Sequence, residues 1–165
     1  MRLLQTPEER HTRRNHNPWL LAAGTLSAAA SVLHIATIIG GPDWYRFFGA
    51  GEEMARAAER GSFMPALVTV AIAGMLALWS LYAFSAASLV RRLPFLRTAI
   101  VLITVMYMLR GLAVVPLLVL KPQLVDTFAI VSSLIVLIYG ITYAVGTWQV
   151  WPRLGMTDEA DPATA

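Results

Sequence analysis

A largely apolar stretch, residues 99–120, carries a single arginine, Arg110, near its middle. As a helix rising about 1.5 Å per residue, the stretch is long enough to cross a hydrocarbon core of about 30 Å. A guanidinium at that depth costs from about 2.5 to above 10 kcal/mol unless it finds a partner or water. The stretch therefore predicts a membrane-spanning helix whose arginine faces a partner, a wet cavity or the interior of a helix bundle.

Composition extends this prediction to the whole chain. Of its 165 residues 57% are hydrophobic and 14% are charged, whereas about 25% of the residues of a soluble domain are charged. The fold class we expect is an all-α integral membrane protein, a bundle of four transmembrane helices forming one domain. The predicted spans are 18–39, 65–90, 99–120 and 128–150.

Basic residues predict the orientation of these spans. Eight arginines lie in the tails 1–17 and 151–165 and in the turn 91–97, whereas four basic residues lie in the loop 40–64 and the turn that begins at Lys121. Because basic residues favour the cytoplasmic side, we expect both termini to be cytoplasmic and 40–64 to be the first outer loop. The expected location is the inner (cytoplasmic) membrane of a bacterium.

The first apolar block has a second interpretation, a signal peptide. A basic segment precedes the block, and Ala28 to Ala30 would suit a signal peptidase. Apolar residues continue to Ile39, which is long for such a peptide, so a retained span is favoured.

The loop 40–64 combines glycines, aromatic residues and a charged segment. The string that begins Asp43-Trp44-Tyr45 is expected at the membrane interface, either as a lid over a pocket or as a wedge seated among lipids. Residues 52–60 predict a short amphipathic helix on the membrane surface, with Glu52 and Arg56 paired one turn apart. Glu53 lies at the edge of the apolar face of that helix.

Small and polar residues recur on one face of each span, and we expect these faces to meet inside the bundle. Pro116 frees the carbonyl of Leu112, which predicts a kink one or two turns beyond Arg110. The residues on these faces include Gly24, Ser27, Ser31, His34, Thr69, Ala73, Ser80, Ala83, Ala87, Tyr107, Arg110, Ser132, Tyr139, Tyr143 and Thr147.

The depth of these residues predicts an outward-facing polar pocket around Arg110, roofed by the loop. None of the spans contains an acid, so the countercharge must come from a loop or from a ligand. We predict a pair between Arg110 and Glu53 in the absence of ligand, with Glu52, Asp43 and Asp126 as the next candidates. The predicted ligand-binding residues are Arg110, His34, Glu53, Glu52, Asp43, Tyr107, Ser132 and Tyr139.

Several classes of function lack their signatures. Cysteine is absent, which excludes disulfides and thiolate metal sites, and no Walker loop or dinucleotide fingerprint occurs. A lone intramembrane histidine does not predict haem, and the net charge of +3 is explained by orientation rather than by nucleic acid. We therefore predict no catalytic residue, metal, cofactor or nucleic-acid partner.

Three functions remain. The leading hypothesis is a membrane protein that binds or transports a small polar or anionic solute at Arg110, with a homodimer completing any pathway. The second is an intramembrane enzyme acting on a lipid or quinone, with His34 and Glu53 handling protons. The third is a non-catalytic subunit or assembly factor whose polar faces meet partner helices.

Overall fold

The computed structural model describes residues 16–155, which form helices and the connections between them, with no strand. Helices α1, α4, α5 continued by α6, and α7 are long and apolar enough to span a membrane. The prediction of an all-helical, four-span membrane protein is thus confirmed. The elements are α1 (Pro18–Gly40), α2 (Pro42–Phe47), α3 (Glu52–Glu59), α4 (Met64–Ala86), α5 (Leu96–Leu112), α6 (Val114–Leu120), the 3₁₀ turn η2 (Pro122–Leu124) and α7 (Thr127–Gly155).

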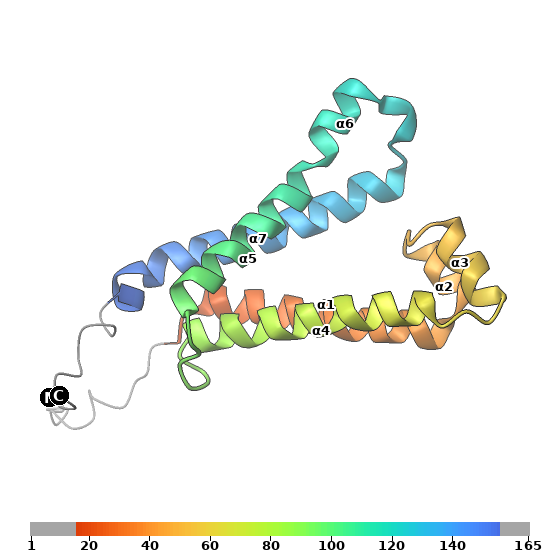
Figure 1. Cartoon of the computed structure of the whole chain (residues 1–165). Helices are drawn as coiled ribbons and strands as arrows, with labels where there is room; N and C mark the ends of the chain where they lie inside the picture. The colour runs from red at the N-terminus through yellow and green to blue at the C-terminus, as the bar shows by residue number, and fades with distance from the viewer. Residues whose placement is uncertain (1–15, 156–165) are drawn as a thin grey trace, which may run out of the picture.

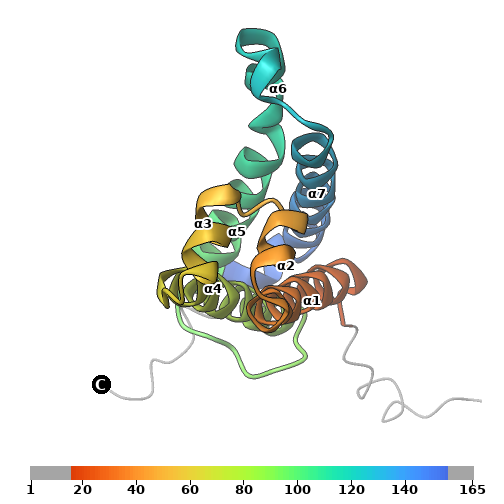
Figure 2. The ribbon, with the colours of Figure 1, turned by 90° about the vertical axis from the view of Figure 1, so that its right-hand side faces the viewer.

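The spans are arranged as two antiparallel pairs, α1 with α4 and α5 with α7 (Figure 1). The pairs meet at the end where α1 begins and α7 finishes, which we call the terminal end, and diverge toward the other end, the α2–α3 end. Viewed from the α2–α3 end, α2 and α3 sit over the ends of α1 and α4, and α6 projects away from them (Figure 2). The bundle is therefore closed at one end and open at the other.

The hydrophobic core occupies the closed part of the bundle. Its members come from the start of α1, the end of α4, the start of α5 and the end of α7, so they lie mainly in the half of each span nearest the terminal end. Burial of these apolar side chains joins the two pairs. The least exposed members are Leu20, Ala23, Ala83, Ala87, Ile100 and Tyr143.

Hydroxyl groups from three helices meet inside this core. Ser27 Oγ lies 2.9 Å from the hydroxyl of Tyr107 and 2.9 Å from that of Tyr143, and Tyr143 also donates to the carbonyl oxygen of Trp79 at 3.1 Å. Buried hydroxyls need such partners, because an unpaired one costs the free energy of its lost hydration. The prediction that the polar faces of the spans meet inside the bundle is confirmed for these residues.

Two helix ends differ from the predicted boundaries. Helix α4 ends at Ala86, four residues before the predicted end, because Ser85 Oγ donates to the carbonyl of Arg91 and accepts from the amide of Leu93. These bonds fold the chain back immediately after the helix. Helix α7 runs through Pro152 to Gly155, where the sequence predicted a stop, because Leu154 is buried and its carbonyl accepts a bond from Arg92 at 2.6 Å.

The third span is interrupted between α5 and α6 at Ala113. The interruption lies within one turn of both Arg110 and Leu112. Pro116 has no amide hydrogen, so the carbonyl of Leu112 lacks the donor that it would have in a regular helix. The predicted kink is confirmed close to the expected position. Beyond it α6 has no buried residue, so this segment packs little against the rest of the described chain.

Candidate functional site

A cavity of about 450 Å³ lies at the α2–α3 end, where the linker between α2 and α3 faces α5 and the start of α7. It brings two arginines and two carboxylates together from distant parts of the chain. Arg110, in the third span, thereby shares a cavity with Arg46 and Glu52 of the loop 40–64. Such a shared cavity is needed if the loop is to form the predicted roof. The lining residues are Arg46, Gly49, Gly51, Glu52, Arg110, Asp126, Phe128, Ala129 and Ser132.

Arg110 reaches this cavity with most of its hydrogen-bonding capacity unused. Its Nη1 donates to Ser133 Oγ at 3.3 Å, a long bond to a neutral group that is itself buried. Within residues 16–155 its guanidinium makes no ion pair, and the side chain is exposed to space that the chain does not fill. A guanidinium offers several N–H donors, so an anionic group entering the cavity would find them available.

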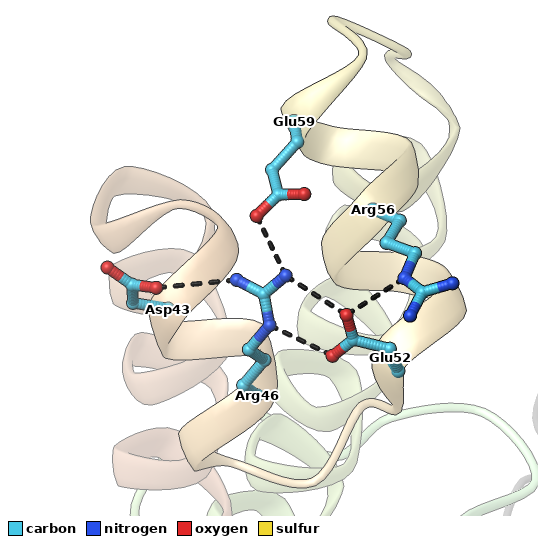
Figure 3. A network of polar contacts seen from close by, with 5 residues as sticks. All are labelled: Asp43, Arg46, Glu52, Arg56 and Glu59. Carbon is cyan, nitrogen blue, oxygen red and sulfur yellow. Dashed lines mark hydrogen bonds and ion pairs between the residues drawn. The ribbon is translucent and has the colours of Figure 1, made fainter.

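Arg46, by contrast, is the centre of a charged cluster on α2 and α3 (Figure 3). Its Nε lies 2.9 Å from Glu52 and its Nη2 lies 3.2 Å from the other oxygen of that carboxylate, a bidentate contact. The same Nη2 donates to Glu59 at 2.7 Å, and Asp43 lies at 3.4 Å from Nη1. The predicted pair between Glu52 and Arg56 is also present, at 3.0 Å.

These contacts decide the charge state of the cluster. A hydrogen bond from Arg46, which has the larger effect, and one from Arg56 lower the pKa of Glu52 to about 2. Hydrogen bonds to Glu52 and Glu59 raise the pKa of Arg46 above its ordinary value. Glu52 is therefore ionised at neutral pH and already shared by two arginines. It lines the cavity but does not neutralise Arg110.

The second cavity carboxylate is occupied as well. Asp126 Oδ1 accepts a hydrogen bond from the amide of Ala129 at 2.7 Å and so caps the start of α7. Both acids that line the cavity thus have partners of their own. Among the described residues, Arg110 is the cation of the cavity without a charged partner, and Asp126 is held by a backbone amide rather than by a cation.

The linker between α2 and α3 closes one side of the cavity through Gly49. This residue has a φ of 68°, which side chains disfavour, and a Cβ added to it would collide with the ring of Phe128 on α7. Tyr45 and Ala55 are buried beneath the linker and seat the two short helices. The sequence did not predict α2, although Pro42 at its first position is a usual helix start.

The predicted pair between Arg110 and Glu53 is not formed in the structure. Glu53 is exposed and makes no ion pair in the described part of the chain. Successive helix positions point about 100° apart, so α3 cannot turn Glu52 toward Arg46 and Glu53 toward the same region. Asp43 stays at the exposed edge of the cluster.

Three other predicted site residues lie away from the cavity lining. His34 Nδ1 lies 2.7 Å from the carbonyl of Ala30 in its own helix. Tyr107 belongs to the buried hydroxyl group around Ser27, and Tyr139 packs edge-on against Tyr107 with ring centroids 5.6 Å apart. Of the residues predicted to form one pocket, Arg110, Glu52 and Ser132 therefore line the cavity, whereas Tyr107 and Tyr139 belong to the packed core. His34, Glu53 and Asp43 belong to neither group.

Sequence reasoning missed several residues of the cavity. Arg46 was counted only for orientation, although its position six residues before Glu52, with glycines between them, allows two short helices to fold face to face. Ser133 and Phe128 carried no signal beyond their place near the start of the last span. Between His16 and Gly155 no group of three or more histidine or acidic side chains could hold a metal ion.

Comparison of the chain with protein-family models, with curated proteins and with solved structures finds no match.

Proposed function

We propose that the protein is a multi-pass membrane protein that binds a small polar or anionic solute, with the anionic group of the solute received by Arg110. The observation that carries the proposal is the guanidinium of Arg110, which makes no ion pair among residues 16–155 and lines a cavity of about 450 Å³. In an apolar span such a cation is costly without a partner, and the two acids that line the cavity accept hydrogen bonds from other groups. An entering anion would supply the missing charge.

The proposal includes the orientation. With both termini cytoplasmic, as the distribution of arginines favours, the α2–α3 end faces outward and solute enters from outside. A bacterial inner membrane is the location that this orientation assumes. The α2–α3 linker, joined to α7 through Gly49 and Phe128, then forms part of the entrance.

Binding is favoured over passage through a single copy. Below the cavity the helices are joined by Ser27, Tyr107 and Tyr143, of which Tyr143 is fully buried. A solute that continued toward the terminal end would have to separate these hydroxyls and the core around them. Transport would therefore require either a rearrangement of the two helix pairs or a second copy of the chain.

The divergence of the helix pairs supports a second candidate, a non-catalytic subunit whose open end receives a partner helix. Helix α6 has no buried residue, and the pairs are farthest apart beside it. A partner would then cover both α6 and Arg110. No comparable observation favours the enzyme hypothesis, since His34 and Glu53 are not among the residues lining the cavity with Arg110.

The test is the thermal stability of purified protein in an uncharged detergent with added acetate, lactate, succinate, sulfate or phosphate. At least one anion is expected to raise the melting temperature of the wild type and to have no such effect on Arg110→Gln. Arg60→Gln is the matched control, because Arg60 is an exposed arginine at the same end that does not line the cavity.

Two results would contradict the binding proposal. One is an anion response that survives in Arg110→Gln, which would place the binding elsewhere. The other is a fixed partner protein that co-purifies with the wild type but is lost from Arg110→Gln, which would favour the subunit candidate. Without ligand, the melting temperature of Arg110→Gln is not expected to fall below that of the wild type, because the substitution breaks no ion pair among residues 16–155.

A further inference from the structure

A second cavity, of about 490 Å³, lies at the terminal end of the molecule. It is formed where the end of α4 and the turn after it face the start of α1 and the end of α7. Its lining includes Arg91, Arg92 and Arg153 and, among residues 16–155, no carboxylate. The two cavities thus lie at opposite ends of the spans.

Charge in the described part of the chain is divided sharply between these ends. All the acids of residues 16–155, which are Asp43, Glu52, Glu53, Glu59 and Asp126, belong to the α2–α3 end. The arginines of the terminal cavity therefore have no carboxylate partner among the described residues. Like charges held together in this way attract an anion.

The floor of the terminal cavity is firmly built. Leu96, Val150 and Leu154 are each 5% exposed or less. Arg92 is fixed in place by its bond to the carbonyl of Leu154, and Asn17 joins α1 to α7 by donating to Gln149 at 2.8 Å. The arginines thus stand at the rim of an apolar floor, an arrangement that suits a ligand with a charged head and an apolar part.

The position of the cavity along the membrane normal narrows the choice of ligand. Arg91, Arg92 and Arg153 all lie within a few residues of the ends of membrane-spanning helices. The phosphate groups of a lipid leaflet lie at this level, just outside the hydrocarbon core. Basic pockets between spans at this level are suited to anionic lipid headgroups.

We propose that the terminal cavity binds a negatively charged phosphate group, held by Arg91, Arg92 and Arg153. The ligand class is a phosphate anion, either the phosphodiester in the headgroup of an anionic phospholipid or a soluble phosphate. This site is independent of the solute cavity, because it shares no residue with that cavity and lies at the other end of the spans. Failure of one proposal leaves the other standing.

The experiment measures the melting temperature of the full chain in uncharged detergent against increasing phosphatidylglycerol. Phosphatidylcholine serves as the lipid with a phosphodiester but no net charge, and inorganic phosphate serves as the soluble ligand. Phosphatidylglycerol is expected to raise the melting temperature and phosphatidylcholine is not. A response to lipid alone identifies a headgroup as the ligand, whereas an equal response to inorganic phosphate identifies a soluble phosphate.

The decisive variant is the double substitution Arg91→Gln and Arg153→Gln, which spares the bond made by Arg92. Each arginine removed should weaken binding about fivefold, because a basic residue near anionic lipid contributes about 1 kcal/mol. The matched control is Arg97→Gln. Arg97 belongs to the same end but lies over the ring of Trp151, 4.0 Å from its centroid, and does not line the cavity.

Three outcomes would overturn the proposal. The first is a double variant that responds to phosphatidylglycerol like the wild type. The second is an equal loss in Arg97→Gln, which would indicate diffuse attraction rather than a site. The third is a response to lipid or phosphate that the full chain lacks and that appears only after deletion of residues 156–165. Such a response would indicate that Asp158, Glu159 and Asp161 occupy the cavity in the full chain.

Discussion

The two helix pairs have the same antiparallel form, but they stay in contact over different lengths. In the α1–α4 pair, Ser80 donates to the carbonyl of Gly24 and Ser31 donates to that of Ala73, so hydrogen bonds link the helices at successive levels. In the α5–α7 pair, Gly111 packs against the backbone of Leu137 and is the last buried residue of α5, and α6 beyond it has no buried residue.

This difference shows how small residues set the length of a helix contact. Glycine, alanine and serine let two backbones approach, and in an apolar solvent such packing replaces the hydrophobic effect as the main attraction between helices. Gly111 is the last glycine of its span, and α6 beyond it has no buried residue. Arg110 immediately precedes Gly111, so it lies at the boundary between the packed and the open part of its pair.

The largest effect is expected from Gly111→Ala. A Cβ at this position would come within 2.8 Å of the backbone of Leu137, which cannot move aside as a side chain can. We expect a loss of about 1–3 kcal/mol in the free energy of unfolding, measured by denaturation in mixed detergent micelles. Such a loss would show that the α5–α7 pair depends on the close approach at Gly111.

The control for that substitution is Gly74→Ala in α4. No atom lies within 4 Å of a Cβ added there, so the change should be neutral or slightly stabilising. Equal effects of the two substitutions would refute the proposed role of Gly111 as the end point of the contact.

A smaller loss is expected from Ser27→Ala, which tests the connection between the two pairs. The substitution leaves the hydroxyl of Tyr107 without its serine partner, whereas Tyr143 keeps its bond to the carbonyl of Trp79. One buried hydroxyl left unpaired costs about 1–2 kcal/mol in unfolding free energy. Thr25→Ala removes an exposed hydroxyl from the same helix and should change stability little; a loss as large as that of Ser27→Ala would argue against the hydroxyl contact as the cause.

The smallest effect is expected in the charged cluster, which belongs to neither pair. Because the folded-state pKa of Glu52 is lowered to about 2, its contribution to stability is complete above the ordinary carboxyl pKa and is lost as the pH falls toward 2. The difference in melting temperature between wild type and Glu52→Gln should therefore be constant from pH 8 down to about pH 5 and should shrink from there to pH 3. A difference between them that grows as the pH falls would contradict the assigned contacts.

Apolar blocks and polar faces were enough to predict the spans and the inward residues Ser27, Thr69 and Ser80. The divergence of the two helix pairs could not be predicted. A polar face on a helix indicates which side faces the bundle, but it does not indicate how far away the neighbouring helix lies. The ion pairing of Glu52 rather than Glu53 could not be predicted either, because it depends on α2, where Arg46 binds Glu52. The similar depth of Arg110 and Ser132 in their spans correctly predicted that both line one cavity. The same argument wrongly assigned His34 to that cavity.

The unequal lengths of the helices have a mechanical consequence. Helix α7 has 29 residues and is about 43 Å long, whereas α1 and α4, with 23 residues each, are about 35 Å long. Near the terminal end the core holds α7 to its shorter neighbours, so a hydrocarbon layer of about 30 Å requires α7 to tilt more than they do. A thicker bilayer would allow α7 to stand more upright, and Phe128 and Ser132 at its start would then shift relative to Gly49. Lipid chain length is thus expected to change the width of the cavity beside Arg110.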